Sequence, residues 1–539
     1  MTPRRITLAG CPRAALTALT ATALGAAALL AGCAATPPPT TTGTPSQPEA
    51  ASGFRSGLTG TTATRHMAAA ANPLAAEAGR QILVAGGSAV DAAIAMQMVL
   101  TLVEPQSSGI GGGAFLLHWD GQRVQSFDGR ETAPMAADEN LFVTPEGRAM
   151  GFVAAVVGGR AVGAPGVLRM LELAHRQHGA LPWARLFEPA IRLADNGFAM
   201  SPRLHTLLAG EKHPAATPAA RAYFFAADGA PKPVGTMLRN PELAATLRAI
   251  ASGGADAFYR GPIAADIVAA VRSHPTNPGR LTDADLAGYQ AKERAPLCTD
   301  YKRWRVCGMG APSSGGIAVA QMLGIFSQRN IAVVAPVAID GRLQPQADAV
   351  HLFSEAGRLA FADRAQYVAD PDFVPVNQAA LLSPAYLAER ARLITDRSLG
   401  RAAAGTPGPA GSAMAPDASP HRIATSHISA VDATGRAVSM TTSIEDAFGS
   451  RLMVRGFLLN NQLTDFSFLP RESDGKGMAR PDGAIVANRV QPGKRPRSSM
   501  APTLIFDRAS NQLVATLGSP GGSQIINYVA KTVVGVLDW

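Results

Sequence analysis

The sequence predicts an α+β protein in which helices and antiparallel strands occur in separate blocks and stack in layers. Helical runs with clear start and stop signals dominate residues 72–289, and short β-prone runs bounded by turns stand apart from them. The 539 residues are 47% hydrophobic and 17% charged, which is ample for the core of one large or two ordinary domains.

Capping signals locate the helices. Asn72-Pro73 caps and opens the first one, and Ser88 with Asp91 forms the capping box of a second, apolar one. The predicted helices span residues 73–86, 88–104, 166–179, 182–197, 240–253 and 282–289, and two long apolar helices begin at Ser314 and Ala347. The first two follow each other directly, so they need a common partner to pack against.

Two β-prone runs supply that partner. Gly111–Leu117 and Arg123–Asp128 are predicted strands, joined by a turn that contains Asp120, Gly121 and Gln122. The G-x-G-x-x-A pattern of residues 109–114 does not indicate a dinucleotide site, because a helix precedes it and a strand follows it. We expect no cofactor.

Two further strands form a predicted hairpin. Ser426–Val431 alternates in the way a half-buried strand does, a D-x-x-G turn follows, and Arg436–Ser443 is rich in Val, Thr and Ser. A loop of two or three residues places Thr425 opposite Thr442 or Ser443. A threonine hydroxyl at the start of a strand therefore gains a second hydroxyl as its neighbour.

Thr425 is a candidate nucleophile if the chain is cut before it. Threonine needs a base, and a free α-amine, with a pKa of roughly 7.7 to 8.0, can take the hydroxyl proton. Residues 402–420 are mostly Ala, Gly and Pro with almost no charge, which is typical of a flexible loop that can present a scissile bond. The alternative is a surface hairpin that follows a linker.

A series of motifs carries a family resemblance. In chain order they are GGSAVDAAIA, SSGIGGGAF, DGRETAP, PSSGG, ADRAQYVADPDF, TSHIS, SIEDAFGS, LLNNQLTDFS, KRPRSSMAPT and GSPGGS. Together they resemble the γ-glutamyltransferase family of N-terminal-nucleophile hydrolases, over a stretch from about His66 to the last residue. The resemblance implies an αββα sandwich, cut between Ala424 and Thr425 into a large subunit (66–424) and a small subunit (425–539).

The resemblance also implies the roles of the site residues. Thr425 is the nucleophile, Ser443 orients its hydroxyl, and the backbone N–H groups of Gly521 and Gly522 form the oxyanion hole. The implied substrate-binding residues are Arg130, Ser498 and Ser499 for an α-carboxylate, and Glu445, Gln462 and Asp465 for an α-ammonium. Some relatives carry Asn in place of Glu445 and Thr in place of Ser443, which puts the substrate preference in question more than the mechanism.

Each of these residues also has an ordinary structural interpretation. A lone arginine such as Arg130 is usually part of a surface ion pair. Glu445 and Asp465 fit turn or capping roles equally well, and the GSPGG motif would also form a Pro-Gly turn.

The implied activity is transfer of the γ-glutamyl group of glutathione or its conjugates to water, an amino acid or a peptide, through an acyl-enzyme on Thr425. A β-lactam acylase acting on glutaryl-cephalosporin is an alternative on the same scaffold, because a glutaryl side chain also satisfies an α-carboxylate site. The second alternative is an inactive periplasmic lipoprotein that binds glutathione.

The N-terminus is predicted to be an export signal. Residues 1–32 carry two arginines, a weakly apolar stretch and an L-A-G-C sequence that resembles a bacterial lipobox, with Cys33 as the lipidated residue. Residues 33–65 are a Pro/Thr-rich tether, and Ala34 after the cysteine favours the outer membrane. We expect a periplasmic protein whose lipid anchor is its one membrane contact; an ordinary cleaved signal ending near Ala31 or Ala35 is the alternative.

Cysteine and charge patterns limit other functions. Cys298 and Cys307 flank a short hairpin in which a turn at Lys302-Arg303 places them opposite each other, and we expect a disulfide rather than two buried thiols. The chain has no metal-ligand spacing. Its net charge is +9, but the basic residues are scattered, so we expect no nucleic-acid partner.

Two regions depart from the family pattern. The chain ends at Val534–Trp539, inside a predicted apolar helix, whereas relatives continue for several more elements, so the C-terminus looks truncated. Leu469–Gly493, where some relatives carry a lid over the pocket, matches no family pattern.

Overall fold

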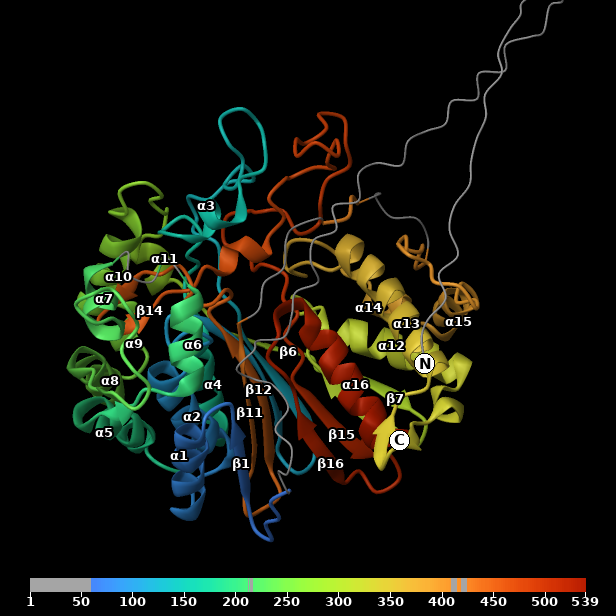
Figure 1. Cartoon of the computed structure of the whole chain (residues 1–539), viewed down its shortest axis with the longest axis horizontal. Coiled ribbons are helices and arrows are strands. Elements are labelled where there is room, and N and C mark those ends of the chain that lie inside the picture. Colours follow the sequence, from blue (N-terminus) through green and yellow to red (C-terminus); the bar gives the residue numbers. More distant parts are fainter. Residues whose placement is uncertain (1–59, 212, 214–216, 409–413, 418–423) are drawn as a thin grey trace, which may run out of the picture. The chain divides into compact units, whose positions relative to one another are not determined.

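The structure, a computed structural model, describes residues 60–211, 213, 217–408, 414–417 and 424–539. Two β-sheets pack face to face and helices cover the outer side of each, which is the αββα sandwich implied by the resemblance (Figure 1). The predicted fold class is confirmed. The predicted export signal, Cys33 and the tether up to residue 59 lie outside the described residues.

The larger sheet has six antiparallel strands and contains the predicted hairpin. In spatial order they are β1 (Met67–Ala70), β11 (Ser426–Val431), β12 (Ala437–Ser443), β2 (Gly113–Trp119), β3 (Val124–Gly129) and β6 (Lys292–Arg294). The β11–β12 register pairs Ser426 with Thr442, so Thr425 lies opposite Ser443. Of the two positions that the sequence allowed opposite Thr425, the structure selects Ser443.

Strand β2 begins two residues later than predicted. The backbone of Gly111 forms a parallel bridge with Leu459, and the N–H of Gly112 turns back to the carbonyl of Gly109 at 3.1 Å. A Cβ on Gly111 would lie 2.2 Å from the carbonyl oxygen of Leu458, so this crossing of two chain segments requires a glycine. The strand can start only after the crossing.

The smaller sheet contains the predicted disulfide. Its strands are, in spatial order, β16 (Leu513–Leu517), β15 (Thr503–Asp507), β8 (Trp304–Gly308) and β7 (Leu297–Tyr301). Cys298 and Cys307 are paired in the β7–β8 register and form a disulfide. Hydroxyls join the two sheets, because Ser439 Oγ donates to the carbonyl of Leu517 at 2.9 Å.

Helices cover both outer faces (Figure 1). Those on the side of the larger sheet are α1 (Pro73–Val84), α2 (Ala89–Val103), α4 (Val167–His178), α5 (Glu188–Asn196) and α8 (Pro241–Gly253). Those on the side of the smaller sheet are α12 (Gly315–Arg329), α13 (Ala347–Tyr367), α15 (Pro384–Arg392) and α16 (Ile525–Leu537). Asn72 caps α1, and the predicted capping box of Ser88 and Asp91 opens α2.

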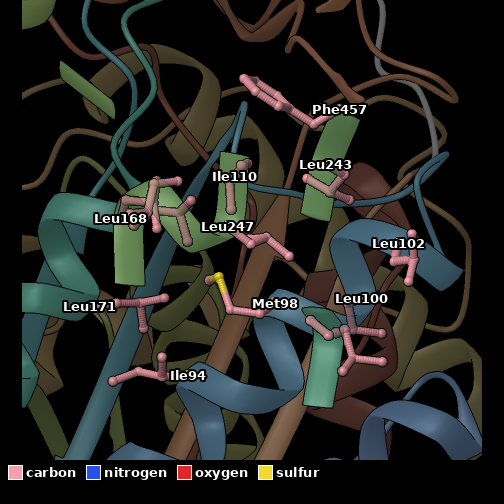
Figure 2. Close-up of a cluster of buried hydrophobic side chains, with 14 of the residues drawn as sticks. Ile94, Met98, Leu100, Leu102, Ile110, Leu168, Leu171, Leu243, Leu247 and Phe457 are labelled. Carbon is pink, nitrogen blue, oxygen red and sulfur yellow. The ribbon is translucent and has the colours of Figure 1, made fainter. Parts of the chain in front are cut away.

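Helix α2 forms the centre of the main core. All of its residues are buried, and Ile94, Met98, Leu100 and Leu102 are among the side chains of the apolar cluster in Figure 2. Because this helix packs on β11 and β12, the core supports the strand pair that begins directly after the predicted nucleophile, Thr425.

The predicted helix over residues 182–197 is divided in two. A 3₁₀ turn, η2 (Trp183–Phe187), precedes α5, and Pro189 lies in the first turn of α5. Proline has no N–H to donate to the preceding turn, so one continuous α-helix cannot form across it.

The remaining elements are short and connect the layers. The helices are α3 (Phe152–Val156), α6 (Pro202–Gly210), α7 (Pro218–Phe224), α9 (Asp256–Tyr259), α10 (Pro262–Arg272), α11 (Asp283–Ala287) and α14 (Gln378–Leu381). The 3₁₀ turns are η4 (Ile331–Val334), η5 (Gln462–Asp465) and η6 (Gly522–Gln524). The strands are β4 (Phe198–Ala199), β5 (Met237–Leu238), β9 (Val337–Ile339), β10 (Arg342–Gln344), β13 (Met453–Val454) and β14 (Phe457–Leu458). Within the described part of the chain, no helix is both long and apolar enough to span a membrane.

Candidate active site

A pocket lies at the start of β11, and its walls come from distant parts of the chain. The lining residues are Arg130, Ala424, Thr425, Ser443, Glu445, Gln462, Asp465, Ser498, Ser499, Met500, Gly522, Ser523 and Ile525. The structure thus brings together the predicted catalytic and substrate-binding residues, with Gly521 as the immediate neighbour of the lining residue Gly522.

Thr425 and Ser443 both point their hydroxyls at the same peptide bond. Thr425 Oγ1 donates to the carbonyl oxygen of Ala424, and Ser443 Oγ donates to that oxygen at 2.9 Å. The two hydroxyl oxygens lie 3.5 Å apart, and the N–H of Glu445 donates to Ser443 Oγ at 2.9 Å. Thr425 is 3% exposed, so this carbonyl is polarised in a site with little access to water.

Arg130 follows β3 and is completely buried. Its Nε donates to the carbonyl of Pro496 at 3.1 Å, and Nη2 donates to the carbonyl of Arg497 at 3.0 Å and to Asp465 Oδ2 at 2.5 Å. Its Nη1 lies 3.7 Å from Glu131 Oε2. The surface ion pair considered for Arg130 is therefore wrong, because the burial of its side chain leaves no exposed charge.

Glu445 and Asp465 form the acidic side of the pocket. Glu445 accepts hydrogen bonds from Asn461 Nδ2 and, at 3.2 Å, from Thr464 Oγ1, and Gln462 Nε2 donates to Asp465 Oδ2 at 2.9 Å. Burial, and then the charge of Asp465, raises the pKa of Glu445 well above its usual range. A cationic group bound here would lower that pKa again, so its arrival would favour release of a proton.

The backbone of Glu445 departs from ordinary strand geometry. Its φ is +80°, a region that residues other than glycine rarely occupy. This turn ends β12 and directs the carboxyl group into the pocket, so a simple capping role does not describe Glu445.

Ser498 and Ser499 are held by the smaller-sheet layer. Ser314 donates from its N–H to the carbonyl of Ser498 at 2.8 Å, and Ser498 Oγ accepts from the N–H of Met500 at 3.1 Å. Ser499 Oγ accepts from Arg364 Nη2 at 2.6 Å. The serine pair is thus fixed beside a buried arginine, which suits an anionic ligand.

The Gly521-Gly522 turn leads into α16. The φ angles are +130° and +55°, and a Cβ on Gly521 would lie 2.7 Å from the ring of Tyr528. Glycine is therefore required at position 521, whatever its catalytic role. Ile525, the first residue of α16, lines the pocket, so the positive end of that helix dipole lies beside the turn.

The arrangement combines the candidate nucleophile Thr425 with groups that suit a zwitterion. Arg130 and the serine pair provide positive charge and donors, whereas Glu445 and Asp465 provide acceptors on the same wall. An α-amino acid carries one carboxylate and one ammonium on adjacent atoms and matches both sets.

Sequence reasoning missed several residues of the site. Met500, Ser523 and Ile525 line the pocket, and Asn461 holds Glu445. The signal for Asn461 was present in the N-N-Q stretch just before Gln462, where a buried amide next to a predicted ligand invites a supporting role.

The segment Leu469–Gly493 contributes no residue to the lining of this pocket. It pairs instead with residues from the first third of the chain. Arg148 Nη2 donates to the carbonyl of Lys476 at 2.7 Å, and the N–H of Ala149 donates to the carbonyl of Gly477 at 2.8 Å. These two loops lie together at the top of Figure 1.

Comparison with known proteins places this site in a family. Residues 75–539 match the family model described as Gamma-glutamyltranspeptidase. The chain belongs to the gamma-glutamyltranspeptidase family. It is 37% identical over 479 residues to a glutathione hydrolase proenzyme of Bacillus subtilis (strain 168), a match that covers 87% of this chain and 77% of that protein.

Other members of the gamma-glutamyltranspeptidase family and a structural relative give the same placement. A glutathione hydrolase proenzyme of Escherichia coli (strain K12) is 35% identical over 482 residues, covering 88% of this chain and 79% of that protein. The crystal structure of cephalosporin acylase from Bacillus halodurans superposes with a TM-score of 0.72 at 27% identity, covering 90% of this chain and 82% of that one.

Proposed function

We propose that this protein is a self-processing γ-glutamyltransferase and glutathione hydrolase whose nucleophile is Thr425. One observation carries the proposal: the Thr425 hydroxyl donates to the Ala424 carbonyl, in a pocket that also holds the Arg130–Asp465 ion pair and the Glu445 side chain. Family membership supports the same reaction. The pocket provides both the bond to be cut in maturation and the groups for a γ-glutamyl substrate.

Maturation proceeds by an acyl shift within the chain. Thr425 Oγ1 attacks the carbonyl carbon of Ala424, the bond from that carbon to the nitrogen of Thr425 breaks, and the hydroxyl proton passes to that nitrogen. Ser443, whose hydroxyl contacts the same carbonyl oxygen, stabilises the charge that develops there. Water then opens the ester, which leaves a carboxylate on Ala424 and restores the hydroxyl of Thr425.

Turnover uses the amine that maturation creates. The α-amine of Thr425 takes the proton of its own hydroxyl, Oγ1 attacks the γ-carbonyl, and the N–H groups of Gly521 and Gly522 stabilise the oxyanion. The proton passes to the departing amine, which leaves a γ-glutamyl ester on Thr425. Water or the amine of an acceptor amino acid or peptide then releases the γ-glutamyl group.

A glutaryl-β-lactam acylase is the second candidate, because a cephalosporin acylase shares the fold over 90% of this chain. The acidic wall favours the first candidate. A glutaryl group has a carboxylate for Arg130 but no ammonium for Asp465 and Glu445, so the buried Glu445 carboxyl group would remain beside an apolar chain. Comparing kcat/KM for glutathione, a γ-glutamyl anilide and glutaryl-cephalosporin separates the two candidates.

We also propose that the protein is exported as a lipoprotein, anchored through Cys33 in the outer membrane and facing the periplasm. The L-A-G-C sequence and the Pro/Thr-rich tether support this location. Radiolabelled palmitate should be incorporated into the wild type but not into a Cys33→Ala variant. Equal labelling of both would contradict the anchor.

Substitution of Thr425 tests the main proposal. Thr425→Ala should remain one chain and be inactive, because it lacks both the attacking hydroxyl and the mature nucleophile. Thr425→Ser should still process, since it keeps the hydroxyl. Gel electrophoresis and N-terminal sequencing of the small chain, together with release of the anilide from a γ-glutamyl anilide, measure both effects.

The wild type is expected to yield a small chain that begins at Thr425. A Thr425→Ala protein that splits at the same bond, or a wild type that is fully active as one uncut chain, would remove the N-terminal-nucleophile mechanism.

A further inference from the structure

Arg364 of α13 lies behind the serine pair of the pocket. Its side chain is buried, and the residue as a whole is 4% exposed. Nη2 donates to Ser499 Oγ at 2.6 Å, and Nε donates to Ser314 Oγ at 2.7 Å. Both partners are neutral hydroxyls, so neither of them balances the charge of the guanidinium group.

The carboxylates near Arg364 are engaged elsewhere. Among the residues that the structure describes, no carboxylate forms an ion pair with Arg364, although the charges of Asp417 and Asp465 act on it. Asp417 pairs with Arg497 at 2.8 Å, and Asp465 pairs with Arg130 at 2.5 Å. A buried cation without a direct carboxylate partner is costly, and an anion that enters the adjoining pocket would lower that cost.

The bond from Arg364 decides where the hydroxyl hydrogen of Ser499 can point. A guanidinium group can only donate, so Ser499 Oγ is the acceptor and its own hydrogen points away from Arg364. That hydrogen has no acceptor within the described part of the chain, and Ser499 lines the pocket. The O–H of Ser499 is therefore available to a ligand, and the guanidinium group on its oxygen makes it a stronger donor.

Ser498, the other member of the serine pair, has different support. Its Oγ accepts from the N–H of Met500 at 3.1 Å, which is a neutral donor. Its carbonyl accepts from the hydroxyl of Ser314 at 2.5 Å, so Ser498 is placed mainly through its backbone. The two serines are therefore not equivalent, because a cation lies directly behind the hydroxyl of Ser499.

We propose that Arg364 is a positioning residue for substrate recognition, which orients the Ser499 hydroxyl towards the α-carboxylate of a γ-glutamyl substrate and supplies a positive charge behind it. The proposal rests on the proposed function and deepens it. A carboxylate that accepts from Ser499 is separated from the guanidinium group by the hydroxyl oxygen alone, so it balances the charge of Arg364. Selectivity for an α-carboxylate follows, because a neutral group in the same place leaves that charge unbalanced.

Arg364→Gln tests the selectivity, since glutamine carries no charge and is too short to reach Ser499. Two substrates are compared, a γ-glutamyl anilide and its analogue in which a neutral carboxamide replaces the α-carboxylate. We expect KM for the first to rise by about tenfold to a hundredfold with little change in kcat, because the lost interaction lies away from the reacting bond.

The carboxamide analogue should respond differently. Its kcat/KM, or its inhibition constant against the γ-glutamyl anilide if it is not turned over, should change by less than about threefold in Arg364→Gln. Arg358→Gln, on the same helix and with a side chain that is 39% exposed, is the matched control. It should behave like the wild type with both compounds.

A double-mutant cycle tests whether Arg364 acts through Ser499. In a Ser499→Ala background, Arg364→Gln should lower kcat/KM for the γ-glutamyl anilide by no more than about threefold, because the hydroxyl that carries its effect is already absent. Additive losses would mean that Arg364 acts by another route, such as its bond to Ser314, and would overturn the proposal.

Ser499→Asp tests the unbalanced charge with Arg364 in place. A carboxylate at this position would pair with the guanidinium group, so Ser499→Asp should melt about 2 °C or more above Ser499→Asn in the uncut Thr425→Ala background. This comparison decides the question if Arg364→Gln fails to fold. An equal or lower melting temperature would mean that the charge of Arg364 is already balanced, which overturns the proposal.

Failure of this proposal is distinct from failure of the proposed function. Unchanged kinetics in Arg364→Gln, or equal losses for the acid and the carboxamide, would overturn the role of Arg364 and leave the proposed function standing. A wild type that neither splits at Thr425 nor acts on the γ-glutamyl anilide would instead contradict the proposed function itself.

Discussion

At the scale of single residues, Arg130 is held mainly by backbone oxygens. Two carbonyls from residues 496 and 497 accept from its guanidinium group, and Asp465 accepts from Nη2. Asp465 and Glu131 provide countercharge, at 2.5 Å from Nη2 and 3.7 Å from Nη1. The carbonyls fix the orientation of the guanidinium, so the buried Arg130 side chain lines the pocket in one defined geometry.

Arg130→Lys should show how much of the role of Arg130 depends on its positive charge and how much on the hydrogen-bonding geometry of its guanidinium group. Lysine keeps the charge but cannot reach two carbonyls and Asp465 at once, so we expect kcat/KM on γ-glutamyl substrates to fall by about a hundredfold or more. Self-cleavage should persist, because Thr425 and Ser443 do not contact Arg130. Arg123→Lys, directly before β3 and 71% exposed, is the matched control. Unchanged kinetics in Arg130→Lys would return this residue to a structural role.

The sequence could predict which residues are candidates for the site, but it could not predict their burial or their contacts with distant segments. The family motifs around Thr425, Arg130 and Glu445 are specific enough to predict these three residues as parts of the site. No local pattern could show that Arg130 is fully buried or that Asp417 pairs with Arg497, since both depend on segments far apart in the chain. The burial of these side chains depends on how the layers of the sandwich pack together, and the hydrophobic periodicity of one segment does not predict that packing.

At the scale of elements, the predictions of helix and strand boundaries succeeded where turn or capping residues mark those boundaries in the sequence. The turn after β11 and the alternation on either side fixed the hairpin, and capping side chains fixed the starts of α1 and α2. They failed at the start of β2, where Gly111 crosses Leu458, and in the helix that Pro189 divides. In both cases an interaction absent from the local pattern determines the boundary.

The β7–β8 hairpin provides a prediction at this scale. Replacing Cys298 and Cys307 together by alanine should lower the free energy of unfolding by about 2 to 3 kcal/mol, because the bridged loop is short. Kinetics should not change, since neither residue lines the pocket. Trypsin cuts between the two cysteines, so non-reducing peptide mapping of the wild type should give one linked peptide. Two alkylatable thiols in the native protein would contradict the disulfide.

At the scale of the whole molecule, buried histidines make stability depend on pH. His118 lies against His178 with tilted rings whose centroids are 4.0 Å apart, and burial, followed by the proximity of His178, lowers the pKa of His118 to about 3. An unfolded histidine titrates near 6.5. The unfolded chain therefore binds an extra proton below about pH 6.5, and folding stability falls as the pH drops from there towards 3.

His118→Phe should isolate this effect. Phenylalanine keeps an aromatic ring beside His178 and cannot be protonated, so the variant should gain stability relative to the unsubstituted chain by about 1.4 kcal/mol per pH unit below 6.5. The test is denaturant unfolding in the uncut Thr425→Ala background, with and without His118→Phe. The difference in the free energy of unfolding between the two proteins should change by about 2 kcal/mol between about pH 7 and about pH 5. A difference that stays constant between the two values would exclude His118 as the titrating group.

The strand order of the larger sheet governs how the mature chains would come apart. The hairpin β11–β12 belongs to the small chain, and it lies between β1 on one side and β2 on the other, both from the large chain. Once the peptide bond before Thr425 is cut, neither product can leave without breaking these two ladders and a third one, between β8 and β15 of the smaller sheet. Subunit exchange would then require global unfolding, so the heterodimer should persist at any dilution for as long as the native fold itself survives.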